Sequence, residues 1–166
     1  MTDEASATVD VFDRASNIIR AGTVAGLATD GKNGPDLCAV FYVVMEGGRL
    51  GFKSRRSSTH MRNLATRPQA AALVYAHTST YSAKFGVQLK GVVRGTRNLD
   101  EMAELVELYV DQFQGAGKKL GSIETLADPT TESTFFVFEI AEFRLVDESP
   151  QGNFTMLDFE PFASKL

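Results

Sequence analysis

The chain has 166 residues, 43% of them hydrophobic and 23% charged, with a formal net charge of −4 and a pI near 5.2. This size and composition exclude a disordered or fibrous protein and predict one globular domain over residues 1–166, with its core at about 10–147 and a C-terminal tail at 148–166. The acidic N-terminus lacks the pattern of a secretory signal and no apolar run could span a bilayer, so we expect a cytoplasmic protein without a membrane partner.

Apolar residues at helical spacing predict a first helix over 11–21, which ends at a glycine. Strands are expected at 23–29 and 37–45, joined by a turn at 30–35. The second strand is apolar on both faces, so one face should line a barrel interior while the other lies under a partner element, a ligand or a second subunit. It contains Cys38, the only cysteine, which excludes an intramolecular disulfide and is expected to be a core thiol.

A Gly-Gly hairpin leads from this strand into a short strand that ends at Ser54. A short helix follows, with hydroxyl residues at its start and Pro68 after its end. The other expected elements are strands at 70–75, 85–96 and 134–146, the last being two strands or one bent strand, a helix at 99–113 and a loop around 128–129. About six strands with helices outside the sheet favour an α+β, mainly β fold: a six-stranded antiparallel split β-barrel, closed or partly closed, with flanking helices.

Two stretches carry more apolar surface than one small barrel can cover. One is the strand at 37–45, and the other is the run that contains Phe135, Phe136 and Phe138. A two-fold partner would cover both, because one patch then buries its own copy. We therefore expect an obligate homodimer with a large, core-like interface.

Charge is divided unevenly along the chain. Residues 47–99 contain no Asp or Glu, but they hold ten of the seventeen Lys and Arg residues and both histidines, so the rest of the chain carries −14, seven Lys and Arg against 21 acids. A basic region without acidic neighbours indicates an anionic partner. The basic residues are interleaved with strand-forming runs, which favours a phosphorylated small molecule over nucleic acid.

The segment 51–60 is the strongest candidate for a binding site. It ends a strand and opens a helix, so the free amide groups of the first helical turn point toward the same place as Ser58 and Thr59. Lys53 and Arg55 add positive charge beside them. These residues predict a phosphate site; the alternative is that a serine only caps the helix and that the cations are solvated loop charges.

Four further polar residues are considered as candidates. Without a carboxylate to orient it, His60 is expected to be a phosphate ligand or a surface residue instead of a general acid or base, and His77 has less support. Gln88 and Lys90 share one face of a later strand, where they could hydrogen-bond the edge of a heterocycle or simply form a solvated face. Two distant histidines give little support for zinc, and no metal is predicted.

Three motifs of this chain occur together in one family of proteins: the strand-to-helix segment that ends in Ser58-Thr-His-Met-Arg-Asn-Leu64, then Arg67-Pro-Gln-Ala-Ala-Ala72, and then Val87-Gln-Leu-Lys-Gly91. In these, the chain resembles the pyridoxamine 5′-phosphate oxidase-like FMN-binding split β-barrels over about residues 10–147. Within that superfamily it looks most like the little-characterised YhbP-like branch.

The resemblance implies that FMN is the cofactor and that it is held at the interface of a homodimer. It also implies a set of cofactor-binding residues: Phe41 beside the flavin ring, Lys53 and Ser54 in contact with the flavin, Ser58, Thr59 and His60 on the phosphate, and Gln88 and Lys90 reaching the ring from an adjoining strand. Arg55, next to Ser54, is predicted to bind the cofactor as well.

The sequence departs from true pyridoxamine 5′-phosphate oxidases in two ways. In those enzymes the positions that align with Cys38 and Val43 are basic, and a basic pair stands where this chain has Thr59 and His60. The chain also has no Trp and lacks the C-terminal strand that grips pyridoxal phosphate in those enzymes. We therefore expect an FMN-dependent oxidoreductase acting on an unknown small molecule, not a vitamin B6 oxidase; the alternative is a non-catalytic carrier or sensor that binds a flavin, a deazaflavin or haem.

Overall fold

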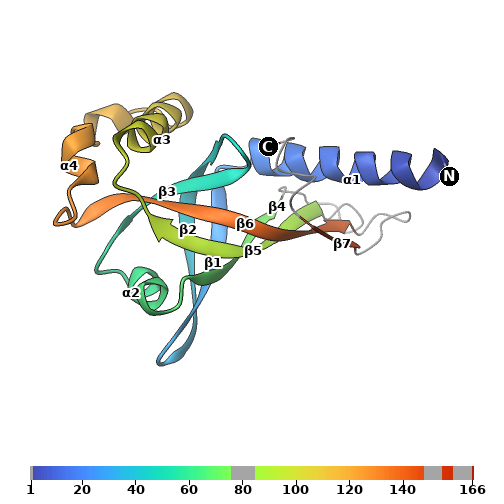
Figure 1. Cartoon of the computed structure of the whole chain (residues 1–166), viewed down its shortest axis with the longest axis horizontal. Helices are drawn as coiled ribbons and strands as arrows, with labels where there is room; N and C mark the ends of the chain where they lie inside the picture. The colour runs from blue at the N-terminus through green and yellow to red at the C-terminus, as the bar shows by residue number, and fades with distance from the viewer. Residues whose placement is uncertain (1, 76–84, 148–154, 159–165) are drawn as a thin grey trace.

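A computed structural model of the chain describes residues 2–75, 85–147, 155–158 and 166, and for residues 2–10 and 155–158 it describes the backbone alone. Figure 1 shows the course of the chain. In chain order the elements are α1 (Thr2–Ala21), β1 (Val24–Gly31), β2 (Gly34–Met45), β3 (Arg49–Arg55), α2 (Thr59–Thr66), β4 (Gln69–Tyr75), β5 (Phe85–Gly95), α3 (Leu99–Gln112), the 3₁₀ turn η1 (Ala116–Lys118), α4 (Ile123–Ala127), β6 (Ser133–Asp147) and β7 (Thr155–Asp158).

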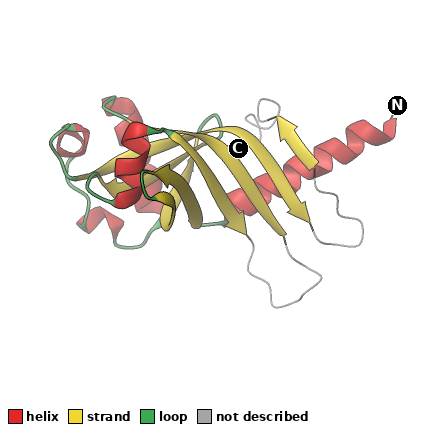
Figure 2. Ribbon diagram, turned by 90° about the horizontal axis from the view of Figure 1, so that it is seen from below, coloured by secondary structure: helices red, strands yellow, loops and turns green. Residues whose placement is uncertain are grey.

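The strands form a closed antiparallel barrel. Neighbouring strands pair in the order β3-β2-β1-β4-β5-β6, and β6 pairs back onto β3 to close the ring. The short strand β7 pairs with the C-terminal part of β6 outside the ring. The six-stranded antiparallel barrel with flanking helices is thus confirmed, with α3 and α4 at one end of the barrel and α1 at the other (Figures 1 and 2).

The last long strand is one bent strand. β6 pairs with β5 along most of its length, and the register shifts where Lys90 pairs with Glu142 and Gly91 pairs with Ile140, which leaves Ala141 as a bulge. A Cβ on Gly91 would lie 2.0 Å from the carbonyl oxygen of Glu139, so glycine is required at this close approach. The bulge lets β6 close the barrel with its first half and pair with β7 with its second half.

Two separate apolar cores account for the double-faced strands. The barrel interior holds residues such as Tyr42, Phe52 and Phe138, and the outer face of β2, β3 and β6 forms a second core with α3 and α4. Phe135 belongs to that second core, and Phe136 to the first. The expectation that the Phe135–Phe138 run needs a second chain to cover it was wrong, because these rings are buried within the chain itself.

Several short elements were not anticipated from the sequence. Ser122 is the N-cap residue of α4, and its hydroxyl accepts a hydrogen bond from the Thr125 amide; the helix buries Leu126 in the second core. β7 lies within the predicted tail. Such elements have too few residues to show a clear periodicity, and tertiary contacts stabilise them.

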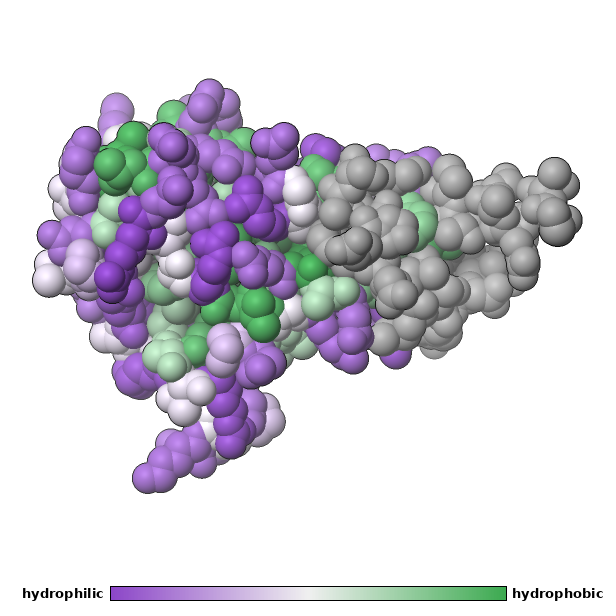
Figure 3. All heavy atoms as spheres, viewed as in Figure 1, coloured by the Kyte–Doolittle hydropathy of each residue, from purple (hydrophilic) through white to green (hydrophobic). Residues whose placement is uncertain are grey.

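One part of β2 keeps apolar side chains at the surface. Leu37 is 73% exposed and Phe41 57%, whereas Val40 and Tyr42, which alternate with them, are buried. Cys38 is half-buried against the barrel core, and burial raises the pKa of its thiol. Figure 3 shows one face of the molecule, on which green apolar patches interrupt a mostly purple surface.

Candidate functional site

The barrel opens between β2 and β3. The two strands pair only from Tyr42 and Phe52 to Met45 and Arg49. Beyond that point, residues 34–41 pair with β1, and the end of β3 pairs with β6. Within the described residues, the facing edges of β2 and β3 are therefore not joined by a strand ladder at the level of Phe41, and their backbone groups are available for other partners.

Side chains of α3 enter this opening. The Tyr109 hydroxyl donates to the carbonyl oxygen of Phe41 at 2.9 Å, and the Gln112 side-chain amide donates to that of Tyr42 at 3.2 Å. The Tyr109 ring packs at 4.7 Å from the ring of Phe113, measured between centroids. The C-terminal half of α3 thus holds β2 at the point where its pairing with β3 ends.

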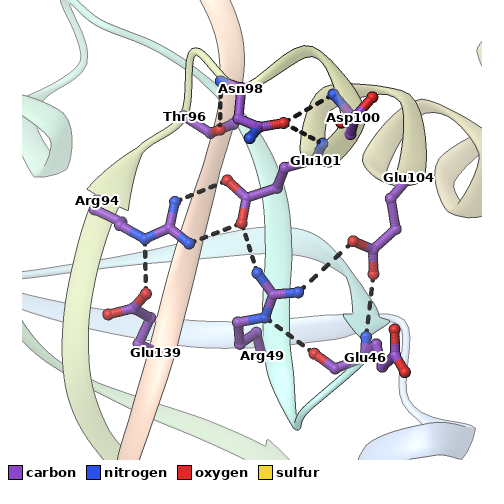
Figure 4. Close-up of polar contacts among 9 residues, drawn as sticks. All are labelled: Glu46, Arg49, Arg94, Thr96, Asn98, Asp100, Glu101, Glu104 and Glu139. Atoms are coloured by element: carbon purple, nitrogen blue, oxygen red, sulfur yellow. Dashed lines mark hydrogen bonds and ion pairs between the residues drawn. The ribbon is translucent and has the colours of Figure 1, made fainter.

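Five charged side chains fix the other end of α3 against the barrel (Figure 4). Glu101 accepts from Arg49 at 2.5 Å and from both terminal nitrogens of Arg94 at 2.7 and 2.8 Å. Arg94 also donates to Glu139 at 2.7 Å, and Arg49 lies 3.7 Å from Glu104. We call these five residues the ion-pair network.

A cavity of about 870 Å³ lies beside the opening, between the β2–β3 edge and the α3–η1 turn. Its volume is in the range of small-molecule sites. Four of the residues expected to bind a cofactor line it: Phe41, Lys53, Ser54 and Arg55. The cavity thus brings together residues of two strands that the sequence placed on either side of a hairpin.

A cluster of hydroxyl and imidazole groups adjoins the cavity at the end of β3. The Ser54 hydroxyl lies 2.7 Å from Nε2 of His60, and the Ser58 hydroxyl lies 3.1 Å from the same nitrogen. The two hydroxyl oxygens are 3.4 Å apart. Because Ser54 belongs both to this cluster and to the cavity lining, the two are contiguous; we call Ser54, Ser58 and His60 the Ser-His cluster.

The start of α2 lies at this cluster. Ser58 is the N-cap residue, as the sequence indicated, but its hydroxyl makes no capping hydrogen bond and donates instead to the Arg55 carbonyl oxygen. The first turn of α2 contains no acidic residue. The Glu132 carboxylate accepts from the amide and hydroxyl of Ser57, just before the helix. The amides of the first turn itself are not neutralised by residues of that turn, and an external anion can bind them. Thr59 begins the helix and its hydroxyl accepts from Arg62 at 3.2 Å.

The electrostatics of the site favour an anion. The ammonium group of Lys53 donates to the Ser133 hydroxyl at 2.6 Å, and burial together with the nearby Arg55 charge lowers the pKa of Lys53. Burial also lowers the pKa of His60, and the opposing effect of Asp36 is smaller. His60 is therefore neutral at pH 7 and can donate or accept one hydrogen bond at Nε2, depending on its tautomer.

Gln88 and Lys90 lie elsewhere on the chain. β5 neighbours β4 and β6, not β3. On β6, Thr134 pairs with Ser54, and Arg144, ten residues further along, pairs with Gln88. At about 3.3 Å per residue, Gln88 is roughly 30 Å along the strand from the Ser-His cluster. Lys90 forms an ion pair with Glu142 at 3.2 Å. The structure thus does not bring these two residues to the cavity of their own chain.

Several residues of the cavity were not identified from the sequence. Tyr109 and Phe113 had the spacing of ordinary core residues in a helix, and only the tertiary structure shows that they face the opening between β2 and β3. Lys118 and Lys119 follow α3 in a turn that carried no motif. His77 lies outside the described residues.

The described residues contain neither a candidate metal centre nor a membrane-spanning helix. In the described residues no group of three or more His, Cys, Asp and Glu side chains could hold a metal ion. Likewise, none of the helices in the described ranges has the length and apolarity needed to cross a membrane.

Comparison with known proteins shows similarity in structure. No protein-family model matches the chain, and no curated protein matches its sequence. A heme binding protein from Mycobacterium smegmatis superposes with a TM-score of 0.76 at 23% identity, over 93% of this chain and 60% of that one. A conserved hypothetical protein from Mycobacterium tuberculosis gives 0.63 at 18% identity, over 89% and 86% of the two chains.

A third similar structure carries a family description. It is a protein related to general stress protein 26, of the pyridoxinephosphate oxidase family, from Clostridium acetobutylicum. It superposes with a TM-score of 0.65 at 12% identity, over 92% of this chain and 97% of that one. At these identities the likeness concerns the fold. The chain also spans only 60% of the length of the mycobacterial heme binding protein.

Proposed function

We propose that this chain, which has the split β-barrel fold of the pyridoxine phosphate oxidase-like proteins, is an FMN-binding flavoprotein and an oxidoreductase acting on a small molecule. The observation that carries the proposal is the Ser-His cluster, which stands at the uncapped start of α2 and adjoins an 870 Å³ cavity through Ser54. A phosphate with a planar ring attached needs these two features side by side.

The donors present fit a phosphate monoester. The Ser54 hydroxyl can donate, the Ser58 hydroxyl can donate once it turns away from the Arg55 carbonyl oxygen, the Nε2–H tautomer of neutral His60 supplies one ring N–H, and the first turn of α2 supplies backbone amides. Lys53 and Arg55 would contribute positive charge, and Phe41 would lie beside the ring. When bound, FMN supplies the electron-transfer chemistry; the residues of the chain hold it and shape its surroundings.

Removal of the hydroxyls tests the phosphate site. We expect Ser54→Ala and Ser58→Ala each to weaken FMN binding about tenfold, because each removes a hydrogen bond to a charged group. Ser57→Ala is the matched control, since the Ser57 hydroxyl binds Glu132 and not the cluster. Titration of the flavin-free protein with FMN measures the three affinities. If Ser54→Ala and Ser58→Ala bind FMN as tightly as the wild type, the phosphate lies elsewhere.

Turnover is tested separately from binding. An oxidoreductase should have its bound FMN bleached by a nicotinamide donor, or by another small reductant, under anaerobic conditions, and reoxidised by an acceptor. A protein that binds FMN with full affinity but is reduced by no such donor would be a carrier or sensor.

We further propose that two copies of the chain form a dimer over the outer face of β2, β1 and β4. Strand pairing aligns exposed apolar side chains there: Leu37, Phe41, Val24, Leu73 and Tyr75. Leu73 pairs with Gln88, so Gln88 borders the same face. A second copy seated on this face could bring its Gln88 and Lys90 to the cavity of the first, which one chain alone cannot do.

Charge placed on this face tests the dimer. Leu37→Glu should convert a dimer to a monomer in light scattering, because the carboxylate would be buried without a partner. Leu99→Glu is the control, since Leu99 is also exposed but lies at the start of α3, away from this face. A wild-type chain that is monomeric at low micromolar concentration with FMN bound would contradict the dimer.

Haem is the second candidate, favoured by the similarity to the heme binding protein of Mycobacterium smegmatis. The absorption spectrum of protein purified without added cofactor separates the two. Bound FMN gives the flavin absorption bands and is released by heat as a mononucleotide. A Soret band would show instead that the bound cofactor is haem.

A further inference from the structure

The cavity has a second wall whose residues the phosphate site does not use. This wall is made by the end of α3 and the turn that follows it, and it contributes Phe113, Lys118 and Lys119. The ring of Phe113 lies 5.2 Å from that of Phe41 across the cavity lining, edge to face. The rings of Phe41 and Phe113 thus form an aromatic surface that continues from β2 to the end of α3. Lys118 and Lys119 come a few residues after Phe113 and line the same cavity.

The turn is built so that it folds back on α3. Gly115 has a φ of +79°, a conformation that favours glycine, and the amide of Ala116 donates to the Phe113 carbonyl oxygen at 3.0 Å. The amides of Lys119 and Leu120 then donate to the carbonyl oxygen of Ala116. These hydrogen bonds fix the path of the chain that carries the two lysines at the cavity.

The cavity lining carries positive charge without acidic residues. Four cations line it, Lys53, Arg55, Lys118 and Lys119, and no Asp or Glu does. In the described part of the chain none of the four belongs to an ion pair. The mutual effect is visible at Lys53, whose pKa is lowered in part by Arg55. The single phosphate group at the Ser-His cluster would leave the α3–η1 end of this field without a counter-charge.

We propose that the α3–η1 turn is a second ligand site, in which Lys118 and Lys119 bind the carboxylate or phosphate of a planar aromatic small molecule whose ring lies against Phe113. If the chain is a flavoprotein as proposed above, this molecule is the class of substrate that exchanges electrons with the flavin. The lysines select for the anionic group, and the aromatic surface selects for a flat ring.

The test compares three probes of the same ring size: 1-naphthoate, 1-naphthyl phosphate and the neutral 1-naphthalenemethanol. Calorimetric titration gives their affinities for the FMN-loaded protein, in which the Ser-His cluster is occupied, or for the protein as purified if it binds no FMN. We expect at least one anion to bind about tenfold more tightly than the alcohol, and Lys118→Ala/Lys119→Ala to remove that difference while leaving the affinity for the alcohol unchanged. The tighter anion identifies whether the group is a carboxylate or a phosphate.

Two controls make the result specific. Lys32→Ala removes an exposed lysine that lines a different cleft and should change no affinity. Phe113→Leu should weaken all three probes, because it removes the ring contact without changing charge. Equal affinity for the anions and the alcohol, or anion affinity that survives in the double lysine variant, would overturn the proposal.

Titration with FMN distinguishes failure of the second ligand site from failure of the flavoprotein proposal. The double lysine variant should bind FMN within about twofold of the wild type, since its phosphate donors at the Ser-His cluster are intact. If the protein binds no FMN but discriminates the naphthyl anions through Lys118 and Lys119, the flavoprotein assignment fails and the second ligand site stands.

Discussion

The two ends of α3 treat charge in opposite ways. At its start, the arginines of the ion-pair network, Arg49 and Arg94, are each matched by carboxylates at hydrogen-bonding distance (Figure 4). At its end, the cations of the cavity face hydroxyls, amides and aromatic rings, and no acidic side chain lines the space between them. The same helix is thus fixed by ion pairs at one end, and at the other it borders cations that belong to no ion pair among the described residues.

We infer that the paired cations at the start of α3 serve folding and that the cations of the cavity serve binding. A cation paired with a partly buried carboxylate contributes to folding, and its loss leaves the carboxylate without a partner. A cation with no carboxylate nearby contributes little to folding and raises the local concentration of anions. The middle of the sequence is uniformly basic, so it gives no sign of which cations belong to which class.

The largest expected effect comes from Arg94→Ala. It removes the hydrogen bonds to Glu101, whose side chain is only 13% exposed, and to Glu139. We expect a loss of about 2 kcal/mol in the free energy of unfolding, a value reduced for the partial exposure of the arginine. Arg97→Ala, at an exposed position before α3, should change the free energy by less than about 0.5 kcal/mol. Urea denaturation measures both, and equal effects of the two substitutions would show that the ion pairs of Arg94 add nothing specific to the stability of the fold.

Acid should weaken the ion-pair network, but only well below neutral pH. The guanidinium of Arg94 lowers the folded-state pKa of Glu101 to about 2. Because this pKa is depressed, the network's contribution is present above the unfolded pKa of about 4.3 and is lost as pH falls toward about 2. Glu101→Gln should therefore lose about 1 kcal/mol at neutral pH and show a smaller fall in stability across that window. A parallel pH dependence in the variant and the wild type would contradict this account.

A cavity cation should behave differently from Arg94. Lys53→Met keeps the apolar stem and removes a charge that burial and Arg55 already disfavour. We expect its free energy of unfolding to stay within about 0.5 kcal/mol of the wild type, while its FMN affinity falls. A destabilisation as large as that of Arg94→Ala would show that Lys53 also serves the fold.

The smallest effect should come from His60. Burial lowers its folded-state pKa below the ordinary 6.5, so the unfolded chain binds more protons just below that value. The stability of the flavin-free protein should therefore be complete above about pH 6.5 and decline slightly as pH falls through that region. His60→Gln should give a flatter profile in thermal unfolding, and an unchanged slope would assign the decline to other groups.

The sequence by itself determined much of the barrel. Alternation, turn residues and helix spacing gave six strands and three helices near their observed places, because these signals are local and follow the period of each element. It also indicated the segment around Ser58 and His60, because a basic stretch without acidic residues and a strand-to-helix junction can both be recognised from the order of residues alone.

The tertiary structure alone decided what covers each apolar face and what lies beside the site. Phe135 and Val43 required a cover, and α3 and α4 provide it from within the chain. The Tyr109 hydroxyl binds the backbone of Phe41, which is 68 residues away in the sequence. Gln88 belongs to one of the motifs of the resembled family, but it lies on β5, far from the cavity of its own chain. Such contacts depend on strand order and on where the β2–β3 pairing stops, and no local pattern of residues records either of them.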